Sequence, residues 1–335
     1  MIPVSVLNLV PIREGQNRAQ AIESMIELAQ ETERIGYTRY WIAEHHNMPS
    51  LVSSATQVLI GHTLAHTNKI RVGSGGVMLP NHSPLLVAEQ YGTLATIYPD
   101  RVDLGIGRAP GTDRPTATAL RRNERNLSLN YPNDVQMLQR YFRSSDEQGY
   151  VRAFPGVGLN VPIYMLGSST ESAHLAAELG LPFAFAAHFA PRLMDAALEI
   201  YRREFKPSDV LEKPYVIVCL NVIAADTDEE ARFLAGSQQQ FIANIIKNTR
   251  QPLQPPVTET HIQWGSEQEQ AAVNEMLACS LIGSKASVAA QFEALQIRLR
   301  ADEIMVVSYI YYQQKQYHSY RLFHEIASSY QPSSL

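Results

Sequence analysis

Side chains able to move a proton or bind an anion follow three short apolar runs of the sequence. The tetrapeptide 44–47 (Glu-His-His-Asn) comes after the run ending at Ala43, and Arg108 comes after the run 102–107. Ser168, Ser169 and Ser172 follow a third run. An imidazole exchanges a proton near neutral pH, and hydroxyls at a helix start can help to hold a phosphate. The pattern therefore indicates acid–base chemistry and an anion site.

The adjacent histidines His45 and His46 cannot both serve one site. Successive side chains of a strand point to opposite faces, so only one of the two can enter a site at the strand end. The alternative is that both are structural and hydrogen-bond neighbouring loops. A metal site would need ligands such as His45, His82 and His188 to converge, and the chain has no His-x-His or HExxH spacing. We therefore expect one catalytic histidine and no metal.

Two glycines interrupt the apolar run at residues 70–79. Glycine inside a strand is unfavourable relative to alanine by about 0.5–1 kcal/mol, so Gly75 and Gly76 need a reason. One reason is the close approach of a flat ligand, and the other is a β-bulge that curves the strand.

The glycine-rich segment 105–111 resembles a dinucleotide fingerprint only superficially. That fingerprint needs a helix to begin at once, whereas Pro110, Gly111 and Pro115 keep this stretch a loop. Arg108 then reaches an anion or a polar ring edge, or it forms a salt bridge with Asp103 or Glu44. The serine turn at 168–172 likewise allows two interpretations, phosphate binding or ordinary helix capping.

The elements that must position these residues alternate between short apolar runs and amphipathic stretches. Eight such units are recognisable, with helices expected at about 19–34, 53–65, 84–97, from about 131, 169–179, 191–205, 228–246 and 317–329. Eight strand–helix units predict a closed (β/α)₈ TIM barrel in the α/β class. We expect a single domain over residues 1–335, with insertion loops at about 109–130 and 248–269, the second of them at the surface. An open doubly wound sheet is the alternative.

Composition narrows the class of partner. The 335 residues carry a formal net charge of -5, which does not favour nucleic acid as a partner. The apolar start of the chain is broken by Asn8, Pro11 and Arg13, so neither a signal peptide nor a membrane span is expected. Cys219 and Cys279 indicate neither a disulfide framework nor a thiolate metal site, and a cytoplasmic protein is expected.

Four ordered blocks resemble the bacterial luciferase-like, flavin-dependent monooxygenases over essentially the whole chain. The blocks are Tyr40–Asn47, Gly73–Pro84 with Ala88-Glu89-Gln90, Arg101–Arg108 and Tyr164–Ser169. The resemblance implies reduced FMN supplied by a separate flavin reductase, dioxygen, a flavin 4a-hydroperoxide and a small organic substrate. It also implies a homodimer formed through early helices.

The same resemblance assigns roles to residues. His45 matches the catalytic histidine of the family. Gly75-Gly76 matches a non-prolyl cis peptide behind the flavin ring, and the ring would lie near Leu7 and these two glycines. The serines Ser168, Ser169 and Ser172 match the phosphate turn, and Arg108 matches an arginine near the flavin. Arg121 and Arg122 are candidates for a second phosphate contact, and the contribution of His188 is open.

Three alternatives remain at this point. A deazaflavin in place of FMN would make the chain a hydride-transferring dehydrogenase or reductase, which the motifs do not separate from an oxygenase. A non-catalytic flavin-binding protein is a second alternative, and a metal-dependent hydrolase is a third. The long loop after Gly107 and the insertion after Asn248 are expected to form a lid.

Overall fold

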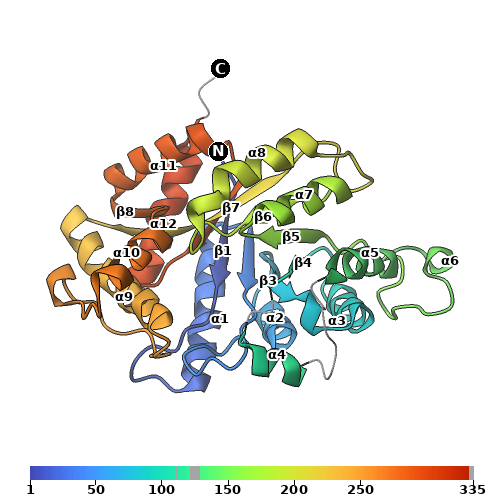
Figure 1. The fold of residues 1–335 in the computed structure, drawn as a ribbon, viewed down its shortest axis with the longest axis horizontal. Coiled ribbons are helices and arrows are strands. Elements are labelled where there is room, and N and C mark those ends of the chain that lie inside the picture. The colour runs from blue at the N-terminus through green and yellow to red at the C-terminus, as the bar shows by residue number, and fades with distance from the viewer. Residues whose placement is uncertain (110–111, 121–128, 332–335) are drawn as a thin grey trace.

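The computed structural model describes residues 1–109, 112–120 and 129–331, in which strands and helices alternate (Figure 1). The strands are β1 (Val4–Asn8), β2 (Arg39–Ile42), β3 (Arg71–Met78), β4 (Val102–Gly107), β5 (Ile163–Gly167), β6 (Phe183–Phe185), β7 (Val216–Ala225), β8 (Ser280–Ser284) and β9 (Glu303–Val307). The α-helices are α1 (Arg18–Ile35), α2 (Thr56–Ala65), α3 (Pro84–Ile97), α4 (Arg114–Leu120), α5 (Tyr131–Tyr141), α6 (Ser145–Gln148), α7 (Thr170–Leu179), α8 (Met194–Glu204), α9 (Asp228–Ile246), α10 (Glu267–Met276), α11 (Lys285–Leu299) and α12 (Gln313–Ser329). Short 3₁₀ turns are η1 (Leu79–Asn81), η3 (Pro191–Leu193) and η4 (Glu259–His261).

Eight of these strands close into a parallel barrel. The strands β1 to β6 pair in order, β6 pairs with β7, β7 with β9, and β9 returns to β1. All pairings are parallel, so every strand's carboxyl end lies at the same rim. The TIM barrel expected from the eight units is therefore confirmed, and the open sheet is excluded.

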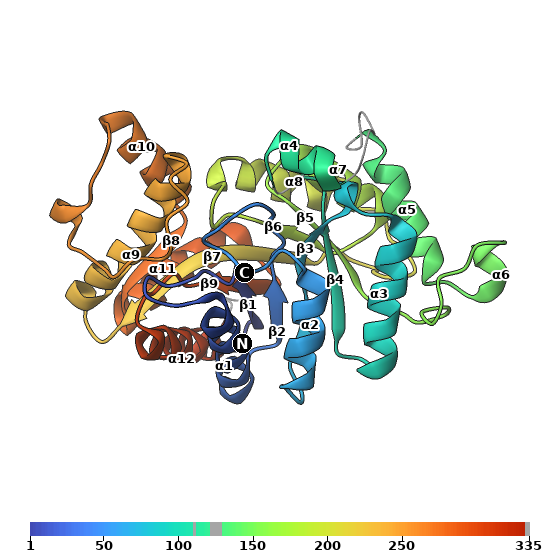
Figure 2. The same cartoon turned by 90° about the horizontal axis from the view of Figure 1, so that it is seen from below.

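One strand–helix unit was missed in the sequence. β8 pairs with Asn221–Ala225, the second half of β7, whereas β9 pairs with Ile217–Asn221 in the first half. The unusually long β7 thus leaves the barrel and carries β8 and α11 beside it, at the side of the molecule that also holds α9 and α10 (Figure 2). The run 280–284 escaped notice because it is short and contains two serines and a glycine.

Helix ends follow local rules that the sequence displays. Asn17 accepts a hydrogen bond from the Gln20 N–H, and the Gln20 side chain accepts one from Asn17 in return, which forms a capping box before α1. Gly36 ends that helix in the left-handed conformation at φ 109°. A helix begins at Tyr131 as expected, but the stretch before it is not all loop: α4 spans Arg114–Leu120, with Pro115 in its first turn, where proline is tolerated.

The insertion after Asn248 is not confined to the surface. Leu253 is completely buried, and its backbone exchanges hydrogen bonds with Ile12 and Glu14 in the loop after β1. This contact was not visible in a polar, proline-rich stretch, because burial of Leu253 depends on which loop it meets in space.

Apolar side chains form two main layers. Strand residues that point outward pack against the helices, whereas Leu7, Trp41, Ile217 and Met305 belong to a separate cluster inside the barrel. That interior cluster continues upward to loop and helix residues, among them Leu51, Phe241 and Leu253. The mouth of the barrel is thus roofed by apolar side chains.

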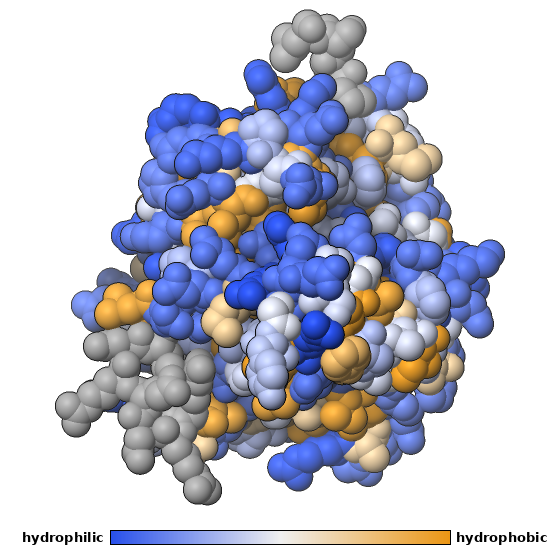
Figure 3. All heavy atoms as spheres, turned by 90° about the vertical axis from the view of Figure 1, so that its right-hand side faces the viewer, coloured by the Kyte–Doolittle hydropathy of each residue, from blue (hydrophilic) through white to orange (hydrophobic). Residues whose placement is uncertain are grey.

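The face that carries α5 and α6 is mainly hydrophilic, and apolar side chains form small patches among polar ones there (Figure 3). No helix in the described parts of the chain has both the length and the apolar character needed to cross a membrane.

Candidate active site

His45 lies at the rim where β2 ends. β2 ends at Ile42, and Trp41 and Ala43 belong to the interior cluster. The charge of His45 acts on His188 after β6, so the two rings share the barrel mouth. The Nδ1 of His45 is buried, and no group of the described residues hydrogen-bonds to it. Burial lowers the pKa of His45 to about 4, against the opposing effect of the neighbouring Glu44 charge. The imidazole is therefore neutral at pH 7, with a nitrogen left over for a bound molecule.

His46 points away from that site and is structural. Its Nε2 lies 2.8 Å from Glu44 Oε1, and the same oxygen lies 2.8 Å from His82 Nε2. The second carboxylate oxygen accepts the Met78 N–H at 3.2 Å. Burial alone would raise the pKa of Glu44, but the hydrogen bonds from His46 and His82 outweigh it and bring that pKa to about 2. The carboxylate thus ties the β2 end to the loop after β3.

These same three groups are also close enough to hold a metal ion. The ligand atoms of Glu44, His46 and His82 all lie within 4.8 Å of one another. From the sequence, the candidate ligands for a metal were His45, His82 and His188. Only His82 belongs to the cluster that the structure shows, so this cluster was not predicted. Three hydrogen bonds already satisfy the carboxylate, which is the simpler account of the cluster.

His188 stands on the opposite side of the mouth from His45. It follows β6, and β2 and β6 are four strands apart in the eight-stranded ring. Burial, and secondarily the charge of His45, lower the pKa of His188 to about 3. Its Nδ1 is also buried without a partner. The role of His188 was open from sequence, and its position across from His45 depends on barrel closure.

The glycine pair lies in β3 beside Leu7. The peptide bond between Gly75 and Gly76 is cis, in agreement with the expectation from the resemblance. The pairing register with β4 shifts between Ser74 and Val77, which is the irregularity that the bulge interpretation required. A Cβ at Gly75 would lie 2.6 Å from Leu7 Cδ1, yet Gly75 keeps some exposed surface.

Close packing continues from β3 into β4. A Cβ at Gly76 would lie 2.8 Å from the Gly105 carbonyl oxygen, so no larger residue fits there without movement of backbone. Glycine at these positions therefore allows close packing between neighbouring strands, whether or not a ligand also binds there.

Arg108 and Ser172 line one cavity of about 290 Å³. Tyr131 and Glu171 line it as well. Asp103 and Glu44, the two carboxylates considered as salt-bridge partners for Arg108, are engaged elsewhere: Asp103 by Arg39 and Arg71, and Glu44 by the two histidines.

The serine turn after β5 is shaped by Gly167. A Cβ at Gly167 would lie 2.3 Å from Ser172 Cβ, so only glycine lets the first turn of α7 approach the strand end this closely. Ser169 is the N-cap residue of α7, but its side chain makes no capping hydrogen bond. Its Oγ lies 3.4 Å from that of Ser172. Arg108 and Ser172 thus border one space beside the N-terminus of α7, which favours an anion, although the Glu171 carboxylate lines the same space.

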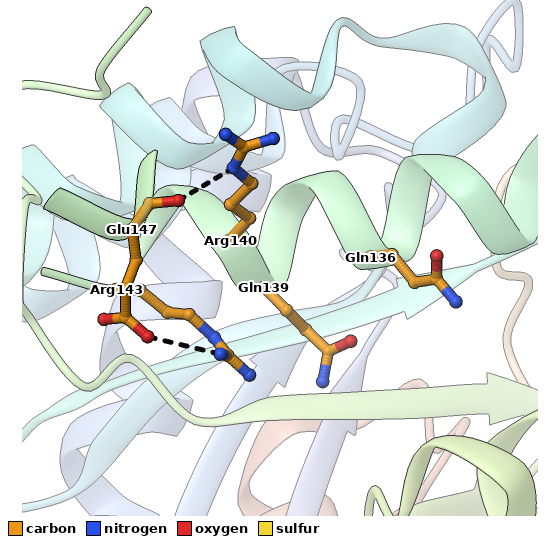
Figure 4. Close-up of a pocket in the computed structure, with 5 residues that line it drawn as sticks. All are labelled: Gln136, Gln139, Arg140, Arg143 and Glu147. Atoms are coloured by element: carbon orange, nitrogen blue, oxygen red, sulfur yellow. Dashed lines mark hydrogen bonds and ion pairs between the residues drawn. The ribbon is translucent and has the colours of Figure 1, made fainter. Parts of the chain in front are cut away.

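A larger cavity of about 400 Å³ lies on α5 and α6 and is not part of this rim (Figure 4). Arg140 Nε donates to the Glu147 carbonyl at 2.9 Å, and Arg143 Nη1 lies 3.3 Å from Glu147 Oε1. Because its lining comes from these helices and from no strand end, it is a surface groove beside the barrel.

Three loops meet above the mouth. Arg250 donates to the Asn47 carbonyl at 2.8 Å and lies 3.6 Å from Asp113, which in turn accepts from the Asn47 side chain at 3.0 Å. Asn47, Asn248 and Arg250 all have positive φ. We call this set, Asn47, Asp113 and Arg250, the loop clasp. Sequence reasoning named both loops as lid candidates but missed the residues that join them.

The expected site residues gather at one end of the barrel. Leu7 lies in β1, His45 lies just after β2, and Gly75 and Gly76 lie in β3. Arg108 follows β4, and the serines follow β5. Arg121 and Arg122 lie outside the described residues. Asn221 and the carboxylate network at Glu44 were not predicted as parts of the site.

Comparison with known proteins gives the family. The sequence model of the luciferase-like monooxygenase family matches residues 2–301. The chain belongs to the luciferase-like monooxygenase family. Within this family it is 48% identical over 321 residues to a luciferase-like monooxygenase of Escherichia coli (strain K12), with 96% of each chain covered. It is 52% identical over 306 residues to the uncharacterised protein YvbT of Bacillus subtilis (strain 168), covering 91% of this chain and 90% of YvbT.

Other relatives carry names that state a reaction. N-acetyl-S-alkylcysteine monooxygenase of Bacillus subtilis (strain 168) is 33% identical over 295 residues, which cover 81% of this chain and 87% of that protein. The structure of apo-MsnO8 superposes with a TM-score of 0.87 at 32% identity, covering 97% of this chain and 98% of that one. The family and these relatives support an oxygenase.

Two more distant structures share only the fold. One is the oxygenating constituent of 3,6-diketocamphane monooxygenase in complex with FMN, with a TM-score of 0.75 at 18% identity, covering 99% of each chain. The other is an F420-dependent secondary alcohol dehydrogenase, with a TM-score of 0.63 at 14% identity, covering 97% of this chain and 98% of that one. The same barrel fold therefore occurs in a protein solved in complex with FMN and in an F420-dependent enzyme.

Proposed function

We propose that this chain is a monooxygenase that takes reduced FMN and dioxygen and oxidises a small organic substrate. The observation that carries the proposal is the neutral imidazole of His45, whose buried Nδ1 has no partner and which stands at the same rim as the anion cavity. An enclosed acid–base group beside an anion site is what a phosphate-bearing redox cofactor requires.

The described residues fit FMN in two respects. Arg108, Ser168, Ser169 and Ser172 would hold its phosphate: Arg108 and Ser172 line one cavity, and Ser168 and Ser169 stand directly before α7, whose N-terminus favours an anion. The ring would lie near Leu7, Gly75 and Gly76, where Gly75 keeps exposed surface inside a strand. Reduced flavin would supply the electrons that activate dioxygen.

The protein's own part is proton transfer and exclusion of water. His45 would hold or release a proton at Nδ1, since burial keeps the ring neutral at pH 7. Leu51, Phe241 and Leu253 roof the mouth, which keeps bulk water from the reacting atoms.

A deazaflavin-dependent dehydrogenase is the second candidate, favoured by the shared barrel of the F420-dependent alcohol dehydrogenase. The test is a titration of the full chain with FMN, reduced FMN and deazaflavin, followed by oxygen uptake in the presence of a flavin reductase. Tight binding of reduced FMN with substrate-dependent oxygen uptake supports the monooxygenase. Hydride transfer from reduced deazaflavin without oxygen uptake would replace it by the dehydrogenase.

We further propose that the chain forms a homodimer through its early helices. Val58 on α2 and Leu86 and Ile97 on α3 are more than half exposed although apolar, at 70%, 54% and 59%. Burial of such side chains favours self-association. Sedimentation velocity measures the state directly, and a monomer at micromolar concentration would exclude the dimer.

A further inference from the structure

The wall of the barrel mouth opposite His45 carries polar groups that the proposed chemistry does not use. Asn221 lies on β7 and alternates with Ile217 and Cys219, which belong to the interior cluster, so its side chain points inward. It is 1% exposed, and its Nδ2 donates to the His188 carbonyl at 2.6 Å. That bond fixes the orientation of the amide, because a carbonyl oxygen can accept only from the nitrogen.

The remaining amide oxygen is an acceptor without a donor. Among the described residues, neither Asn221 Oδ1 nor His188 Nδ1 has a hydrogen-bond partner, although both atoms are buried. A buried polar atom that lacks a hydrogen bond is unfavourable, so such atoms in native proteins need an explanation. Two of them lie in the same wall, one on β7 and one in the turn after β6, and a third lies at His45 across the ring, which indicates a place for a bound molecule.

The space between these groups favours an uncharged molecule. Burial holds the pKa of His188 at about 3 and that of His45 at about 4, so both rings are neutral at pH 7. In the described strands, the charged side chains facing inward are Arg39, Arg71, Asp103 and Glu303, which lie near the amino ends of their strands and bond to one another. An ion placed near Asn221 would have no counter-charge, at a large desolvation penalty.

We propose that Asn221 and His188 form a specificity site that selects an uncharged substrate with an apolar body and a hydrogen-bond donor, an N–H or O–H group, next to the atom that is oxidised. The inference rests on the proposed function, because it names the substrate class of that same site. Asn221 Oδ1 accepts the donor, and the apolar body packs against the roof residues Leu51 and Leu253.

A matched pair of probes tests this site without reliance on turnover. Hexanamide has N–H donors, N,N-dimethylhexanamide has the same carbonyl and no donor, and hexanoate is an anion. Isothermal titration calorimetry on the full chain, with and without FMN, measures each dissociation constant. We expect hexanamide to bind about tenfold to a hundredfold more tightly than either of the other two, since a buried acceptor left unmet weakens binding by that factor.

Two variants assign the preference to its residues. Asn221→Leu removes the acceptor at similar volume and should bring hexanamide and its dimethyl analogue within about twofold of each other. His188→Phe keeps a ring and removes the nitrogens, so it should also shrink the preference, and it tests the site should the Asn221 variant unfold. His174→Gln on the exposed face of α7 is the control and should keep the wild-type ratio.

The proposal is overturned if the wild type does not prefer hexanamide, or if Asn221→Leu and His188→Phe both fold and retain the preference. Failure of the proposed function is a separate result. If the wild type discriminates between the two amides but binds neither FMN nor reduced FMN, the proposed monooxygenase function is wrong. The specificity site at Asn221 and His188 would still be supported.

Discussion

Single residues decide the chemistry through their burial. His45, His46 and His82 are the same side chain within one small region, yet only His45 has a buried nitrogen without a partner. The other two hold Glu44, and so fix the loop that carries His45. The environment of each ring, rather than its type, separates the acid–base group from its supports.

Replacement of His45 is the first prediction. His45→Ala should lower turnover by about 10²- to 10⁴-fold while FMN affinity stays within about threefold, because proton transfer is lost and the anion cavity is untouched. Single-turnover kinetics with reduced FMN and flavin fluorescence measure the two quantities. His318→Gln, at an exposed pair with Asp226, is the control, and unchanged product formation in His45→Ala would remove this residue from the mechanism.

The depressed pKa values of His45 and His188 predict how stability depends on pH. Both folded pKa values lie below the value of about 6.5 for an unfolded histidine. Between about pH 6.5 and 4 the unfolded chain therefore binds protons that the folded chain does not. Their contribution to stability is complete above pH 6.5 and is lost as the pH falls through this window.

Urea unfolding at pH 7.5 and pH 5 measures the effect. These two groups should contribute about 2–4 kcal/mol to the decrease in the free energy of unfolding, and His188→Phe should reduce the decrease by about half. Glu44 has a folded pKa of about 2, so its protonation lowers the free energy of unfolding only below about pH 4.5, outside the pH range of this measurement. An equal decrease in wild type and His188→Phe contradicts the assignment.

At the scale of elements, the loops after the strands form the roof of the site. The segment around Leu253 is bound to the loop after β1, and the loop clasp joins the β2 and β4 loops to it. The clasp side chains Asp113 and Arg250 are partly exposed, so opening of this segment should be easier than global unfolding.

Arg250→Ala tests the clasp. Loss of the bonds to Asn47 and Asp113 should raise the opening of residues 248–256 about fivefold, equal to about 1 kcal/mol for a partly exposed pair. Hydrogen–deuterium exchange measures this, and more hydrogen peroxide should be released per oxygen consumed. Arg203→Ala, on an exposed pair of α8, should leave that segment as protected as in the wild type, and equal exchange in both variants argues against the clasp.

At the scale of the whole molecule, a buried polar network joins strands around the barrel floor. Arg39 bonds to Asp103 at 3.0 Å and to Glu303 at 2.8 Å, and Tyr164 accepts from Arg39 at 2.7 Å. Ser5 donates to Glu303 as well. Residues of β1, β2, β4, β5 and β9 thus meet at the end of the barrel away from the site.

Arg39→Met should destabilise the fold strongly. Removal of one partner leaves Asp103 and Glu303 buried with less compensation, at a loss of about 3–5 kcal/mol. Arg34→Met, at an exposed pair with Glu31, should change the free energy of unfolding far less than Arg39→Met. Chemical denaturation compares the two, and a small effect at Arg39 would mean that the floor network contributes little.

The sequence by itself determined the alternation of elements and the residues at the strand ends. Helix bounds such as Pro84–Ile97 and Asp228–Ile246 follow from local periodicity and caps, and the blocks around His45 and Gly75 carry the family. These signals are local in the chain, which is why they can be read without coordinates.

Only the tertiary structure decided which of those residues face one another. The opposition of His45 and His188, the burial of Leu253 and the inward position of Asn221 all depend on the closure of the barrel, which brings together segments far apart in sequence. The strand β8 was missed for the same reason, since its pairing with β7 rather than its own pattern makes it a strand. Periodicity reports the face of each element, whereas contact between elements is set by packing across the whole chain.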